Sequence, residues 1–141
     1  MLDNTTADAS TGNIVRILRE GRDLWVFKED GTEVFYNSGN ADFPFTRING
    51  AESDIGTISA DSISQTHDSL FWISATGDGK GMVWTNEGYK PRRISTFPVE
   101  VALAEMSTID DVKTYCYQQE GHIFFVMIFP NHTHYNPTVL F

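Results

Sequence analysis

The feature of this 141-residue chain that most limits its fold is a near-repetition of one apolar run. Leu24-Trp25-Val26-Phe27 is matched 46 positions later by Leu70-Phe71-Trp72-Ile73. Short runs rich in aromatic and β-branched side chains, bounded by turn residues, are typical of strands buried on both faces. The repetition therefore predicts β-sheets that stack on one another.

Turn residues divide the first unit, 13–50, into four expected strands. Gly21 and Gly31 stand in turn sequences between apolar runs, and Gly39 follows a third run. Pro44 lies within the last run, which favours an edge strand or a strand start, because proline donates no ladder hydrogen bond. The expected strands are 14–18, 24–27, 34–36 and 43–48, joined as one antiparallel meander.

The same pattern recurs twice, in the units 59–96 and 111–141. A period of about 45–55 residues with four strands per unit is the sequence sign of β-propeller blades. We therefore predict an all-β, propeller-like domain over 13–141, with about three blades in an incomplete ring. Residues 1–12 are polar and are expected to form a flexible N-terminal segment. The later expected strands are 61–65, 70–73, 82–84, 91–94, 112–118 and 123–129.

One helix is expected near 97–106, between the second and third units. Ser95 or Thr96 can cap it, and Pro98 falls in its first turn. The good helix formers between Ala102 and Met106 follow.

Composition narrows the classes of function. The formal net charge of −9 argues against a phosphate-binding surface, because nucleic-acid affinity depends largely on Lys and Arg. The sequence has neither an apolar run of membrane-spanning length nor a signal-peptide pattern at its start, so we expect a soluble protein made in the cytoplasm. Its one cysteine, Cys116, is interpreted as a small core residue.

We identify no catalytic, cofactor-binding or metal-binding residue. His132 and His134 alternate along the chain, but a zinc site needs further ligands, and no Cys, Asp or Glu lies nearby in sequence. His67-Asp68 and Asp110-Asp111 are explained by turn chemistry.

A carbohydrate-binding or glycan-hydrolysing propeller is the alternative interpretation. Residues 74–84 partly resemble the Asp-box hairpin of sialidases, although Asp78 lies one residue too far upstream. Such an enzyme also needs an arginine cluster and an acid/base pair, which the sequence does not assemble. Several aromatic residues could stack on sugars, but their place within apolar runs indicates a core role. They are Trp25, Phe27, Trp72, Trp84, Phe124 and Phe125.

Several segments together resemble the packaged-DNA stabilisation proteins of short-tailed bacteriophages. They are 22–27, 30–33, 42–45, 88–96, 115–122 and Phe129-Pro130, and the resemblance spans about residues 13 to 130. It implies a structural tail hub or accessory protein of the virion, made late in the host bacterium. Such a protein contacts other tail and portal proteins and helps to close the portal channel so that packaged DNA is retained. The chain is shorter than typical members, and 131–141 lacks the expected Trp-containing strand.

An incomplete ring also predicts self-association, because its first and last sheets would keep uncovered apolar faces. Trp25, Phe27, Phe124 and Val126 lie near the two ends of the predicted array. We expect these side chains to be buried only on association, in a homo-oligomer.

Overall fold

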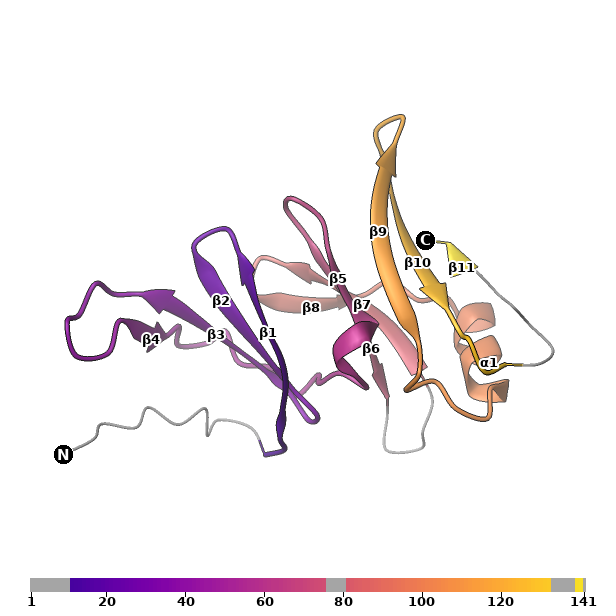
Figure 1. Ribbon diagram of the computed structural model, residues 1–141, viewed down its shortest axis with the longest axis horizontal. Helices are drawn as coiled ribbons and strands as arrows, with labels where there is room; N and C mark the ends of the chain where they lie inside the picture. The colour runs from indigo at the N-terminus through magenta and orange to yellow at the C-terminus, as the bar shows by residue number, and fades with distance from the viewer. Residues whose placement is uncertain (1–10, 76–80, 133–138, 141) are drawn as a thin grey trace.

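The computed structural model describes residues 11–75, 81–132 and 139–140, which form three antiparallel sheets standing side by side along the long axis (Figure 1). The sheets follow one another in chain order, from the N-terminal to the C-terminal end of the molecule. The predicted flexible segment 1–12 lies outside the described residues except for Thr11 and Gly12.

The first sheet is the predicted meander. Its order is β1-β2-β3-β4, with every neighbouring pair antiparallel. Gly21 turns β1 into β2 with a φ of 60°, a conformation that glycine adopts without steric cost. Pro44 directly precedes the edge strand β4, as its missing N–H requires. The strands are β1 Ile14–Glu20, β2 Asp23–Lys28, β3 Thr32–Asn37 and β4 Phe45–Arg47.

The second sheet repeats this order with β5-β6-β7-β8. The expected strand 61–65 is shorter than predicted, because Asp61 belongs to the 3-10 helix η1 Ala60–Ser62. Ser62 closes that turn: its Oγ donates to the Ser59 carbonyl at 2.7 Å and accepts from the Ser59 N–H at 3.3 Å. The strands are β5 Ile63–Gln65, β6 Leu70–Ala75, β7 Gly81–Glu87 and β8 Lys90–Arg93.

The third sheet has the order β11-β10-β9 among the described residues. Its two long strands, β9 Lys113–Gln119 and β10 His122–Ile128, form the hairpin that rises above the rest of the molecule in Figure 1. The sequence did not predict β11, Val139–Leu140, which pairs with β10 opposite Val126 and Met127. A two-residue strand is too short to give a period-2 pattern.

The predicted helix is α1, Phe97–Glu105. Thr96 is its N-cap residue, with extended backbone (φ −91°, ψ 161°), and Pro98 lies in the first turn. Leu103 packs the helix into the space between the second and third sheets. Among the described residues, none of the helices is long and apolar enough to cross a membrane.

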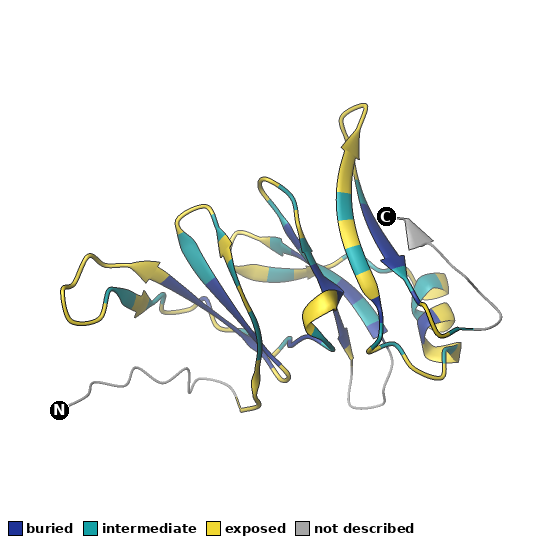
Figure 2. Cartoon of the chain, in the orientation of Figure 1, coloured by how far each residue is buried: buried dark blue, intermediate teal, exposed yellow. Residues whose placement is uncertain are grey.

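The core lies between successive sheets, where the strands are dark in Figure 2. Trp25 and Phe27 of β2 face the second sheet, and the Phe27 ring meets Trp72 edge-on at 5.3 Å. On the other side of the second sheet, Phe71 stacks on Phe125 at 5.6 Å. The two matched runs are thus second strands of successive sheets packed on their neighbours, as the repetition predicted.

The expectation about side chains buried only on association is wrong for three of the four residues. Trp25, Phe27 and Val126 are fully buried in the single chain. For Trp25 and Phe27 the physical reason is strand alternation, because successive side chains point to opposite faces. In β2 this turns Trp25 and Phe27 towards the second sheet instead of the open end. Phe124 is half-buried.

The connection between the first two sheets is held to the first sheet by backbone hydrogen bonds. Thr32 and Ser53 exchange backbone hydrogen bonds of 2.8 and 3.0 Å, and the Thr57 N–H donates to the Lys28 carbonyl at 3.0 Å. Gly56 fits there because a Cβ would lie 2.0 Å from the Glu29 carbonyl oxygen. This tight approach sets where the second sheet begins.

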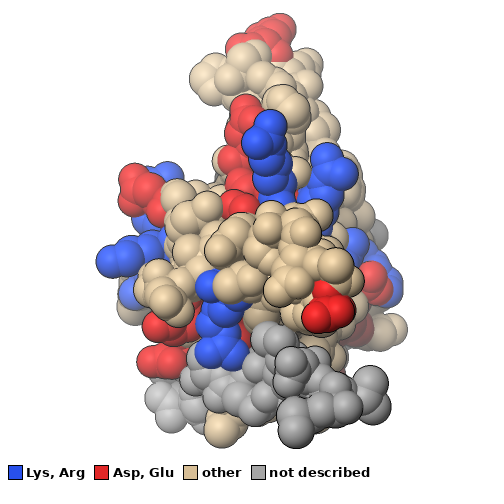
Figure 3. All heavy atoms as spheres, turned by 90° about the vertical axis from the view of Figure 1, so that its left-hand side faces the viewer, with Lys and Arg blue, Asp and Glu red and all other residues tan. Residues whose placement is uncertain are grey.

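A buried carboxylate stiffens the first sheet. Glu33 of β3 is fully buried, and its two oxygens meet Lys28 Nζ at 2.8 Å and Arg47 Nε at 3.0 Å. These ion pairs join β2, β3 and β4, and replacement of Glu33 by a neutral residue would remove the carboxylate that both cations contact. Seen from the end that the first sheet forms, acidic and basic residues are interspersed around a broad uncharged area (Figure 3).

Candidate functional site

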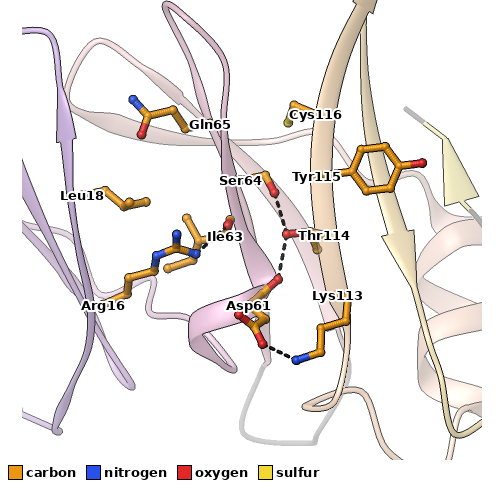
Figure 4. Close-up of a pocket in the computed structure, with 10 residues that line it drawn as sticks. All are labelled: Arg16, Leu18, Asp61, Ile63, Ser64, Gln65, Lys113, Thr114, Tyr115 and Cys116. Atoms are coloured by element: carbon orange, nitrogen blue, oxygen red, sulfur yellow. Dashed lines mark hydrogen bonds and ion pairs between the residues drawn. The ribbon is translucent and has the colours of Figure 1, made fainter.

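A hollow lies where the first strands of the three sheets come together (Figure 4). It has a volume of about 350 Å³ and opens to solvent. In propellers the first strand of each blade lines the central channel. The hollow is therefore the candidate site that the fold offers. Its walls include Arg16 and Leu18 of β1, Ser64 and Gln65 of β5, and Thr114 and Cys116 of β9.

Polar side chains on one side of this hollow tie the first sheet to the second. The Arg16 guanidinium donates from one Nη to the carbonyls of Ala60 and Ile63, at 2.7 and 3.1 Å. Gln65 Nε2 returns a hydrogen bond of 2.8 Å to the Arg19 carbonyl. β1 and β5 are thus joined by side chains that each reach the backbone of the other sheet.

A second set of bonds joins the same two sheets away from the hollow. Asn86 Nδ2 donates to Glu20 Oε1 at 2.9 Å, and the Tyr89 hydroxyl donates to Asp23 Oδ2 at 2.8 Å. The latter bond raises the pKa of Tyr89, because the carboxylate favours the protonated phenol. Residues 66 positions apart in the chain are held together here.

On the other side of the hollow, polar groups tie the second sheet to the third. Thr114 Oγ1 donates to the Asp61 carbonyl at 2.8 Å, and it lies 2.7 Å from Ser64 Oγ. A hydroxyl has one hydrogen, so Ser64 is the donor to Thr114. Lys113 Nζ pairs with the Asp61 carboxylate, and this hydrogen bond together with the lysine charge lowers the pKa of Asp61.

The thiol of Cys116 faces the hollow but is not activated. Burial raises its pKa to about 11, so the neutral thiol dominates at physiological pH. This agrees with the interpretation of Cys116 as a packing residue, since its side chain also contacts the core between the second and third sheets.

Sequence reasoning missed the residues that line this hollow. Their partners lie 44 to 53 positions away, and a lone arginine, serine or threonine in a strand carries no signal of such pairing. The polar side chains around the hollow form hydrogen bonds mainly with one another and with backbone carbonyls. These hydrogen bonds join neighbouring sheets.

The histidine and aspartate residues discussed in the sequence analysis do not form one site among the described residues. His67 and Asp68 lie at the tip of the β5–β6 turn with side chains 98% and 86% exposed. Asp111 accepts a hydrogen bond of 2.6 Å from Asn131, and Asp110 accepts one from Thr108. Within the described ranges, no three His, Cys, Asp or Glu residues are grouped as a metal site would require. His134 and Asp78 lie outside the described residues.

The large aromatic residues of the strands serve the core. Trp25 and Trp72 are fully buried between the first two sheets, so neither can stack on a sugar without opening that interface. Trp84 is partly buried against the same cluster.

Antiparallel meanders, two of them four-stranded, packed face to face and tied at their inner strands, define a β-propeller-like structural module. The family model described as Bacteriophage P22 Gp10, beta-propeller, matches residues 2–137. The chain therefore belongs to this family of phage stabilisation proteins, which are structural components of the virion tail. None of the curated proteins compared with the chain matches it.

Proposed function

We propose that the chain acts as a tail hub or accessory protein that helps to close the portal channel of a short-tailed phage and to retain packaged DNA. The observation that carries the proposal is the family match over 2–137, supported by a structure whose polar groups are used to join its own sheets. The chain works through contacts with other tail and portal proteins, associates with copies of itself, and catalyses no reaction.

The physical logic is mechanical. DNA retained under pressure pushes against the proteins that close the exit, so such a protein must resist deformation. Cores between successive sheets, with side-chain bonds crossing each interface, give a stiff array. A net charge of −9 further suits retention by protein contacts, because the chain does not need to hold the DNA itself.

The test uses DNA-filled phage heads that lack their stabilisation protein. Purified chain is added, and nuclease-sensitive DNA released over time is measured. We expect the chain to bind the heads and to slow release, whereas the variant Trp72→Asp should do neither, because it places a charge in the core between the first two sheets. Unchanged release in heads from the cognate phage would contradict the proposal.

A further inference from the structure

An Asn-Gly pair forms the turn that leads from the first sheet into the connection to the second. The Ile48 N–H donates to the Val34 carbonyl at 2.8 Å, and the Ala51 N–H donates to the Ile48 carbonyl at 3.2 Å. Asn49 and Gly50 are the central residues of this turn, and both are exposed. Gly50 has a φ of 81°, and a positive φ at this place in a turn favours glycine.

The side chain of Asn49 differs from those of the other asparagines. Asn49 is the one asparagine in the sequence that glycine follows, so no neighbouring side chain shields the next backbone nitrogen. Among the described residues, none forms a hydrogen bond with the Asn49 amide. By contrast, Asn37 Oδ1 accepts from the Gly39 N–H at 2.9 Å, and Asn86 Nδ2 donates to Glu20. The Asn49 amide can therefore turn towards the nitrogen that follows it.

A carboxylate already holds the proton of that nitrogen. The Gly50 N–H donates to Glu52 Oε2 at 2.9 Å, within the distance that a general base needs. Transfer of this proton to the carboxylate makes the nitrogen a nucleophile. The adjacent side-chain carbonyl carbon of Asn49 is the electrophile, and a bond between the two closes a succinimide ring. Nucleophile, electrophile and base thus meet in one exposed turn.

We propose that Asn49 is a self-modification site, at which the Gly50 nitrogen attacks the Asn49 amide and the Glu52 carboxylate accepts the Gly50 proton. The bond from Gly50 N to Asn49 Cγ forms, the bond from Cγ to Nδ2 breaks, and the proton leaves with the amide nitrogen as ammonia. Water then opens the succinimide to aspartate or to β-linked isoaspartate. Nothing is oxidised or reduced in either step.

The β-linked product disturbs a turn that is fixed on both sides. Ala51 is 1% exposed in the core between the first two sheets, and Ser53 pairs through its backbone with Thr32. Isoaspartate lengthens the backbone by a methylene group, so the turn bond from Ala51 to Ile48 cannot keep its geometry. Modification should therefore loosen the start of the connection between the sheets.

The experiment incubates the purified chain at mildly alkaline pH and follows the tryptic peptide that begins at Ile48, which contains no other asparagine than Asn49. We expect mass spectrometry to show conversion to aspartate and isoaspartate, faster than at Asn37. Glu52→Gln should slow the conversion about tenfold, a modest general-base effect because Glu52 is exposed. The matched control is Asp54→Ser, which removes a nearby exposed carboxylate and should leave the rate unchanged.

The same incubation in urea separates the effect of the fold from that of the dipeptide. Unfolding removes the hydrogen bond between Gly50 and Glu52, so the wild type and Glu52→Gln should then convert at the same rate. Circular dichroism checks that the variants are folded without urea. Conversion of Asn49 no faster than that of Asn37 in the folded chain overturns the proposal, as does an equal or faster rate in folded Glu52→Gln.

Discussion

At the scale of single residues, the first sheet is held by atoms that tolerate little change. Buried Glu33 pairs with Lys28 and with the partly exposed Arg47, and Gly56 allows backbone to approach backbone where a side chain would collide. The obstacle at Gly56 is rigid, because the nearest atoms are the Glu29 carbonyl group and the Asp30 backbone nitrogen. A flexible side chain could move aside, whereas these atoms belong to the β2–β3 turn.

Gly56→Ala should therefore lower the free energy of unfolding by at least about 2 kcal/mol, since the connector must separate from the turn. The measurement is chemical denaturation followed by tryptophan fluorescence. Gly50→Ala is the control: Gly50 has a φ of +81° but open space around it, so only the backbone penalty of about 1 kcal/mol applies. Equal losses from the two variants would show that the close approach is not tight in solution.

At the scale of elements, turn chemistry and the partly buried carboxylate of Glu100 place the strands and the helix. The β9–β10 turn has positive φ at both Glu120 and Gly121, the pattern of a type I′ hairpin loop. At the start of α1, Glu100 Oε1 accepts from Arg93 Nε and from Ser95 Oγ, both at 2.6 Å. Ser95 Oγ in turn accepts from the Val83 N–H at 3.1 Å, which links the helix to β7.

This network makes the seating of α1 sensitive to pH. Burial pushes the pKa of Glu100 upward, but hydrogen bonds from Arg93 and Ser95 and the charge of Arg93 outweigh it and hold the pKa below its ordinary value of 4.5. A carboxyl with a lowered folded pKa contributes stability above its unfolded pKa, and that contribution is lost as pH falls through the folded value.

Glu100→Gln should thus cost about 1 kcal/mol at neutral pH, a modest figure because Arg93 is half-exposed. The deficit should shrink as the pH falls below 4.5, where the wild-type carboxylate becomes protonated. Thermal unfolding at a series of pH values measures it, with Glu105→Gln on the exposed side of the same helix as control. A deficit that stays constant through the acid range would contradict this account.

At the scale of the whole molecule, acidic and basic side chains are distributed without a basic stripe on the end viewed in Figure 3. A polyanion gains little from a surface with nine excess negative charges, which is why the proposed function relies on contacts with other proteins.

The purified chain should show no salt-sensitive binding to double-stranded DNA. Filter binding at low salt, where electrostatic attraction is strongest, is the measurement, and a basic DNA-binding protein assayed in parallel is the positive control. Micromolar affinity that falls steeply with added salt would count against retention through protein contacts alone.

Much of the fold could be predicted from the chain itself. Apolar runs located β2 and β6, glycine turns located the hairpins on both sides of β2, and Pro98 with its following helix formers located α1. These signals are local, because the pattern of a few neighbouring residues indicates both turn conformation and strand burial. The ends of strands were predicted less accurately. Asp61 belongs to a 3-10 helix instead of a strand, and the two-residue strand β11 was not predicted.

The candidate site could not be predicted in this way. Arg16, Ser64 and Thr114 look like ordinary polar residues of strands, and their roles appear only when three first strands meet around one hollow. The direction of each side chain was also undetermined, which is why Trp25 and Phe27 were expected at an open end and lie instead between two sheets.

The sequence by itself determined that short strands repeat in antiparallel units, that a helix separates the second and third units, and that the surface is acidic. Only the tertiary structure decided which face of each sheet is covered and which polar groups join the sheets. The physical reason is range: strand periodicity and turn chemistry act between near neighbours, whereas a bond such as that from Asn86 to Glu20 depends on how whole sheets stack.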